Sequence, residues 1–285
     1  MKTIAVLLLI LIGGYLILTE SSFSTFSLTS EDEKVQSDSM DGMRKVEVDV
    51  AGAETTIITE KRDDILAELD GKGTLELDQK GKTVRIKVRQ GWFNWFNFER
   101  SELTIFLPEN FNQEMELDIG SGSLELKGPS ADEPLSLTEL TVHIGSGDVS
   151  LENIHATEFI HNGSSGDVDI KHLTTESGTF DLSSGGVHID HYQGPLKADL
   201  SSGELNVQMD QLVGDIEVDV SSGSANIDLP EDSDFTLSGT VSSGDIHCKF
   251  PLKNQSTESR KIQGSYGSGE HSIDLSVSSG SVNIY

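Results

Sequence analysis

The chain has 285 residues, of which 48 are acidic and 20 are basic, and its formal net charge is −28. That charge excludes non-specific nucleic-acid binding, which requires a basic surface, and the single cysteine, Cys248, excludes an internal disulfide. With 28 glycines, 6 prolines and 6% aromatic residues, the composition is typical of a β chain.

The chain begins with an apolar segment, MKTIAVLLLILIGGYLILTE, whose uncharged run of 17 residues extends from Thr3 to Thr19. Such a run is at the short end of the range for a membrane-spanning helix. Lys2 precedes the run and Glu20 follows it, which places the N-terminus inside and the rest outside. A cleaved signal peptide is the competing interpretation, but no small-x-small site follows the run. We expect residues 1–20 to be an uncleaved transmembrane anchor in the cytoplasmic membrane.

Residues 21–43 are rich in Ser, Thr, Asp and Glu and are expected to form a flexible extracytoplasmic stalk. The folded part is expected over residues 44–285. It opens with alternating apolar and polar residues at 45–50, and further strands are predicted at 55–59, 63–69, 74–78 and 83–88. We interpret these strands as the opening coils of one repeat domain.

An aromatic stretch follows, with five aromatic side chains in seven positions: Trp92, Phe93, Trp95, Phe96 and Phe98. One interpretation is an apolar cap that closes the end of the repeat array. The others are insertion at the membrane interface, where Trp is favoured, or a contact with a partner or a sugar. Because so many aromatic side chains exceed what one strand face buries, we expect part of this stretch to contact lipid or a membrane partner.

From residue 111 onward the chain is a tandem repeat around Ser-Ser-Gly or Gly-Ser-Gly, as in LSSGELNV at 200–207. A period near 20 residues is typical of a solenoid. Period-2 alternation on both sides of the tripeptide predicts two short strands joined by a corner, where Gly is suited because it accepts positive φ. The glycines that close the tripeptides are Gly122, Gly147, Gly166, Gly185, Gly203, Gly223, Gly244 and Gly280.

Equivalent apolar residues of the repeats are expected to stack in one buried column. Residues 129–134 interrupt the repeat as a loop and residues 253–263 as a polar insertion. The last gap between repeat glycines is about two periods wide and contains a degraded copy, YGSGEHSI at 266–273. The predicted column consists of Leu126, Leu151, Ile170, Ile189, Val207, Ile227, Cys248 and Ile284.

No pattern in the sequence predicts a catalytic, cofactor or metal site. A serine nucleophile needs its own base and orienting acid, and eight equivalent corners argue against one special serine. His188 and His191 are expected on a strand and its turn, which is weak metal-site geometry. Asp148, Asp167 and Asp245 each follow a repeat glycine and are expected along one ridge. Turn capping is the favoured role there, and Ca²⁺ binding stays open.

The repeats, the opening strand KVEVDV, the Leu-Pro segment at 107–108 and the terminal SSGSVNI resemble the bacterial putative-adhesin family with β-strand repeats, over residues 45–285. The resemblance implies a cell-surface role linked to adhesion or envelope stress, and it brings no catalytic residues.

We therefore predict an all-β chain: a single-stranded β-solenoid of the β-helix type with coils of about 20 residues, preceded by an N-terminal transmembrane helix. Right-handed winding is the fold-level expectation. The predicted function is non-enzymatic, a binding or scaffold role outside the cytoplasmic membrane, with an envelope protein or wall polymer as partner. A polysaccharide-acting β-helix enzyme is the alternative.

Overall fold

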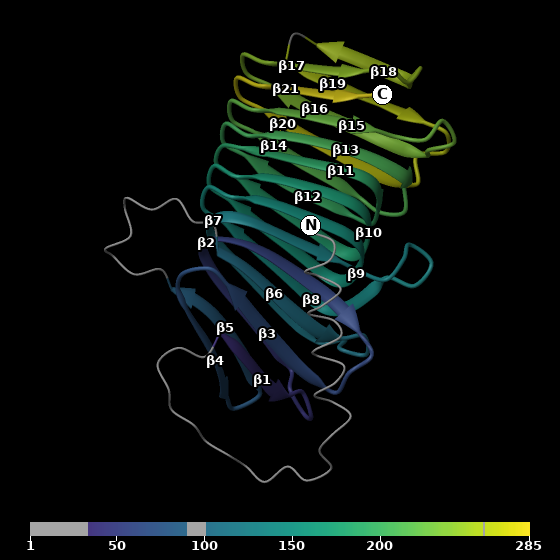
Figure 1. The fold of residues 1–285 in the computed structure, drawn as a ribbon. Coiled ribbons are helices and arrows are strands. Elements are labelled where there is room, and N and C mark those ends of the chain that lie inside the picture. Colours follow the sequence, from purple (N-terminus) through teal and green to yellow (C-terminus); the bar gives the residue numbers. More distant parts are fainter. Residues whose placement is uncertain (1–33, 90–100, 259) are drawn as a thin grey trace, which may run out of the picture. The chain divides into compact units, whose positions relative to one another are not determined.

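The computed structural model describes residues 34–89, 101–258 and 260–285, and the regular structure of these residues is entirely β-strand (Figure 1). The all-β prediction is confirmed for this part of the chain. Within it, no helix is long and apolar enough to cross a membrane. The predicted anchor at 1–20 lies outside the described residues. Of the predicted stalk, Val35–Ser39 form a strand, β1, that pairs with β3 (Asp64–Asp70).

Most strands form two long faces that meet at the Ser-Ser-Gly corners, and the longest strands bend at a corner and belong to both. Face 1 precedes the corners. Its spatial order is β4 (Thr74–Lys80), β5 (Thr83–Arg89), β2 (Lys45–Glu60), β7 (Glu114–Lys127), β8 (Leu135–Ile144), β9 (Asp148–Gly163), β10 (Asp167–Leu182), β12 (Leu196–Leu200), β14 (Ile216–Val220), β20 (His271–Val277), β16 (Phe235–Val241), β19 (Lys261–Tyr266) and β18 (Lys253–Glu258).

Face 2 follows the corners. Its spatial order is β1, β3, β6 (Ser101–Pro108), β2, β7, β9, β10, β11 (Gly186–Gln193), β13 (Glu204–Gln211), β15 (Ser224–Asp228), β21 (Ser281–Ile284) and β17 (Asp245–Cys248). A third, shorter face closes the middle coils, where Leu135–Leu137, Ile154–Ala156 and Leu173–Thr175 lie in register.

The predicted column is present on the inner side of face 2, because each member is the register partner of the next. Its order in space is Ile57, Leu126, Leu151, Ile170, Ile189, Val207, Ile227, Ile284 and Cys248. All of these are buried except Cys248, which is half-buried because β17 is the last strand of the face. The period-2 pattern therefore identified the core, whereas the position of Ile284 before Cys248 could not be read from chain order.

The corners stack through their backbones. Each corner donates N–H groups to carbonyls of its neighbour, as Ser201 does to Leu182, Ser202 to Ser183 and Glu204 to Gly185, at 2.8–2.9 Å. The sequence argument for glycine at the corner was wrong at most positions, since only Gly122 and Gly185 of the eight have positive φ. The cause is close approach: a Cβ on any of the eight would lie under 3.0 Å from the neighbouring corner or a nearby side chain.

The C-terminal end departs from chain order. Strand β20 lies between β14 and β16, and β21 lies between β15 and β17, parallel on both sides. The predicted polar insertion before the final coils is present, and it takes the form of the antiparallel hairpin β18–β19, which adds onto β16. The predicted degraded repeat at 266–273 is wrong: residues 267–270 link β19 to β20, and their Gly-Ser-Gly bonds to Asp234 instead of joining the corner stack.

The N-terminal end is mixed. Strand β2 runs parallel to β7 on both faces and so behaves as a coil, but β1–β3, β3–β6 and β4–β5 are antiparallel pairs. The interpretation of this section as opening coils fits β2, which pairs in parallel with β5, β6 and β7, but not the antiparallel pairs. Antiparallel pairs end the stack with a different hydrogen-bond pattern from the parallel coils, which suits the role of a terminal unit.

Candidate binding surfaces

Face 1 carries a row of acidic side chains next to the corners. Neighbouring coils place Asp181, Asp199 and Asp219 in register, pointing outward, and Asp49 pairs in register with Asp118 further along the row. Burial raises the pKa of the Asp199 carboxyl, and the charges of Asp219 and Asp181 raise it further. We call Asp181, Asp199 and Asp219 the aspartate row. Like charges at the strand spacing of about 4.8 Å repel one another, so this row favours a cationic partner.

A hollow of about 410 Å³ lies beside this row, and its lining includes Asp118, His143, Asn162 and Asp181. Burial raises the pKa of Asp118, and His143 opposes that shift. The imidazole Nδ1 of His143 lies 3.3 Å from the amide nitrogen of Asn162. Asp118 and Asp181 are three coils apart, about 14 Å at strand spacing. The two carboxylates of glycosidases are no more than about 9.5 Å apart, so this pair does not form such a site.

Face 2 carries a ladder of amide side chains on its C-terminal half. The Nδ2 of Asn226 donates to Oδ1 of Asn206, and the Nδ2 of Asn283 donates to Oδ1 of Asn226, both at 2.8 Å. His188 and His247 occupy the same outward row at the two ends of the amide ladder, and both are exposed. Each amide keeps one further N–H for a ligand. The ladder therefore both joins the coils and presents a neutral polar stripe.

The corner between face 2 and the third face has left-handed backbone at residues other than glycine. Asn153, His172 and His191 have φ of 58°, 57° and 63° at equivalent places in successive coils. The rings of His172 and His191 stack with centroids 4.4 Å apart, and Nδ1 of His191 lies 2.9 Å from Oδ1 of Asp210. The sequence singled out His188 and His191 but not this stacked pair, because nothing in the pattern marked the left-handed corner.

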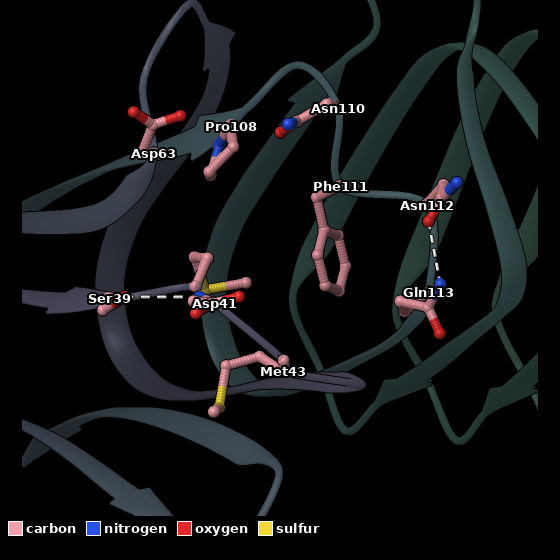
Figure 2. Close-up of a pocket in the computed structure, with 11 residues that line it drawn as sticks. Ser39, Asp41, Met43, Asp63, Pro108, Asn110, Phe111, Asn112 and Gln113 are labelled. Atoms are coloured by element: carbon pink, nitrogen blue, oxygen red, sulfur yellow. Dashed lines mark hydrogen bonds between the residues drawn. The ribbon is translucent and has the colours of Figure 1, made fainter.

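A fourth surface is a hollow of about 440 Å³ near the N-terminal end, shown in Figure 2. Met40 and Met43 precede β2, and Phe111 follows Pro108 at the end of β6. Phe111 is buried and packs in the core. The polar lining residues are Ser39, Asp41, Asp63, Asn110, Asn112 and Gln113. The exposed lining of this hollow is therefore mostly polar.

The predicted contact residues Trp92, Phe93, Trp95, Phe96 and Phe98 lie outside the described residues. Of the predicted ridge, Asp148 and Asp167 are register neighbours, and Asp245 lies in the same row at its far end. Within the ranges that the structure describes, no group of three or more His, Cys, Asp or Glu side chains could hold a metal ion.

These features define a capped β-solenoid that displays repeated polar rows. The chain matches the Toastrack DUF4097 family over residues 43–285, and it belongs to that family. No curated protein matches the chain.

Several solved structures are similar over most of the chain. A "putative adhesin" from Parabacteroides merdae is 14% identical with a TM-score of 0.49, covering 90% of this chain and 98% of the other. A "putative adhesin" from Bacteroides fragilis is 10% identical with a TM-score of 0.45, covering 90% and 99%. A "putative lipid binding protein" from Parabacteroides distasonis is 12% identical with a TM-score of 0.35, covering 90% and 98%.

Proposed function

We propose that the chain is a membrane-anchored extracytoplasmic protein with a non-enzymatic binding or scaffold role at the cell envelope. The observation that carries the proposal is the repetition of one side-chain type in register over successive coils, as in the aspartate row. Stacked repeats create extended surfaces, and a row with one chemistry suits a long partner better than a single small substrate. An envelope protein or a wall polymer is such a partner.

The location of the protein is part of the same proposal. The apolar run at 3–19, with Lys2 before it, favours a single-pass anchor in the cell membrane with the repeat domain outside. The whole chain resembles LiaG, the membrane-anchored protein of the Lia cell-envelope stress system, and we include a link to envelope stress or adhesion on that basis. Protease added to intact protoplasts is expected to digest the repeat domain, and a protected domain would contradict the orientation.

The aromatic stretch at 92–98 is proposed as a contact with lipid or a membrane partner. The chain has two tryptophans, Trp92 and Trp95, so intrinsic tryptophan fluorescence reports on this stretch alone. We expect a blue shift when liposomes are added. Replacing both residues by Ser is expected to leave the melting temperature nearly unchanged; if they cap the core instead, the loss is roughly 3–5 kcal/mol for each aromatic.

The binding role is tested by crosslinking intact cells and recovering the full chain with its partners. The test variant combines Asp181→Asn, Asp199→Asn and Asp219→Asn on face 1. The control variant combines Asp148→Asn, Asp167→Asn and Asp245→Asn, which makes the same charge change on face 2. We expect the amount of recovered partner to fall at least about fivefold with the first variant and to stay unchanged with the second. Equal recovery from both would remove the aspartate row from the proposal.

One observation favours the enzyme alternative, a groove of mixed charges where β2, β5 and β7 meet, lined by Glu47, Asp49, Arg85, Lys87, Glu116 and Asp118. Its cations are paired, however: Lys87 with Asp49 at 2.7 Å, Arg85 with Glu47 at 2.5 Å. Cross-strand pairs of this kind stabilise a sheet surface. Release of reducing ends from purified wall polysaccharide would support the enzyme; we expect none above a heat-denatured control.

A further inference from the structure

The coil formed by β20 and β21 fills a slot whose two walls are both made earlier in the chain. One wall is β14 with β15, and the other is β16 with β17 (Figure 1). The filling coil pairs with both walls along its length. On the side of β14 and β15 the register pairs run from Ile273 with Ile216 to Ile284 with Ile227, and β16 and β17 pair on the other side. Before residues 271–285 pair with the two walls, both walls have unpaired strand edges.

The link into this slot crosses the start of β16. Strands β19 and β20 lie on opposite sides of β16, where Tyr266 and His271 are both register partners of Phe235. The carboxylate of Asp234, the residue before β16, holds the four-residue link. It accepts hydrogen bonds from the Ser268 N–H at 2.9 Å, the Ser268 hydroxyl at 2.6 Å, the Gly269 N–H, and the Glu270 N–H at 2.9 Å.

Other contacts of the link are few. Lys253 donates to the Gly267 carbonyl at 3.2 Å, and the Thr236 hydroxyl donates to the Gly269 carbonyl at 3.5 Å. The link residues Ser268 and Glu270 are exposed, and Gly267 and Gly269 have positive φ. The segment is thus a short, glycine-containing hinge fastened mainly by one carboxylate.

The contacts inside the slot do not depend on the hinge. They consist of the strand ladders, the amide bond from Asn283 to Asn226, and the inward side chains of the column. The filling sequence VSSGSVNI at 277–284 is almost the same as its neighbour VSSGSANI at 220–227. Residues 271–285 of a second copy would make every one of these contacts.

We propose that residues 271–285 exchange between two copies of this chain, so that the C-terminal coil of each copy fills the slot of the other. Exchange preserves the contacts in the slot and breaks only those of the hinge, which makes it a low-cost route to a dimer. A four-residue link spans at most about 14 Å, so the two copies meet at their C-terminal ends. Asp234 opposes exchange, because it stabilises the folded-back hinge.

The experiment uses cysteine pairs in full-length chains that all carry Cys248→Ser. One chain carries Asp219→Cys and a first tag, and a co-expressed chain carries Ser276→Cys and a second tag. Asp219 and Ser276 are register partners on neighbouring strands, a spacing at which a disulfide forms. These two cysteines of different molecules meet only when the coil has exchanged.

The control pair is Asp181→Cys and Asp199→Cys, which are register partners on consecutive coils that no crossover separates. Placing both members of either pair in one chain shows that each disulfide forms. We expect a linked product with both tags from the Asp219 and Ser276 chains, at least about fivefold above the control pair, and a further severalfold increase with Asp234→Asn. Linking no greater than the control would overturn the proposal. The readout involves only copies of this chain, so it is independent of any envelope partner.

Discussion

The middle coils and the C-terminal coils have almost the same repeat but are assembled differently. From β7 to β13, each coil pairs with the coils that precede and follow it in the chain. At the C-terminal end, β20 and β21 pair with β14 and β15, which are about 57 residues away, as between Asn226 and Asn283. A repeat pattern therefore fixes what a coil looks like without fixing where it is placed.

Deleting residues 271–285 is expected to have the largest effect, because it destabilises the C-terminal coils and leaves the middle coils folded. The deletion removes five buried aliphatic side chains, Ile273, Leu275, Val277, Val282 and Ile284, at about 2 kcal/mol each. The sum is of the order of a whole domain's stability. Limited proteolysis is expected to degrade β16–β19 and spare the middle coils. Resistance of β16–β19 to protease would show that the slot holds together unfilled.

Ile227→Asp tests the column where the two regions meet, because Ile227 packs between Val207 of the middle coils and Ile284 of the C-terminal coil. A buried, unpaired carboxylate is expected to cost about 4 kcal/mol or more. Thermal unfolding followed by circular dichroism provides the measurement. The outward neighbour change Asp228→Asn is the control, and an unchanged melting temperature for Ile227→Asp would refute the column.

His161 makes the middle coils sensitive to acid. It is 1% exposed, its Nδ1 has no hydrogen-bond partner among the described residues, and burial lowers its pKa to about 4. Since the unfolded pKa is about 6.5, the unfolded state binds the proton first, and stability falls as pH drops from about 6.5 to 4.

His161→Leu is expected to remove about 3 kcal/mol of this pH dependence. Urea unfolding at pH 7 and pH 4.5 measures the difference. His143→Leu, which changes a half-buried histidine of the neighbouring coil, is the control. A pH profile that His161→Leu leaves unaltered would assign the acid sensitivity to other groups.

Gly223→Ala gives the smallest effect and tests the corner stack itself. The added Cβ would meet the Gly203 carbonyl at a forbidden distance, and forcing the corners apart is expected to cost about 1–3 kcal/mol. Gly120→Ala is the matched control, because its Cβ has ordinary contacts, the nearest at 3.5 Å. Equal melting temperatures for the two variants would contradict close approach as the reason for glycine.

The sequence predicted the parts of the fold that depend on local pattern. Alternation identified the strands and the column, and the period near 20 residues identified the solenoid. It did not predict the slot, because residues 277–284 carry the same signal whichever coils they lie between. It marked residues 253–263 as a polar insertion without predicting the hairpin that they contribute to. It could not show that close packing, and not φ, selects glycine at corners such as Gly223.

The candidate surfaces were harder to predict, because they depend on register. The alignment of Asp181 with Asp199, or of Asn226 with Asn283, appears only when the pairing of the coils is known. The left-handed corner at His172 and His191 has only a weak residue signature: His is enriched among non-glycine residues at positive φ, but most histidines do not adopt it. The aspartate row and the amide ladder are consequences of stacking and cannot be read from one repeat alone.

The corner ladder also has a consequence for how such a chain can change in length. Each middle corner bonds only to the corners directly beside it, so a duplicated coil of 18 to 20 residues would meet the same partners above and below. Such a duplication would lengthen the solenoid by about 4.8 Å and add one member to each outward row. The C-terminal end does not accept such an insertion in the same way, because the coil of β20 and β21 already pairs on both sides with strands that precede it in the chain. Duplication of a whole coil is therefore compatible with the middle of the solenoid and not with its C-terminal end.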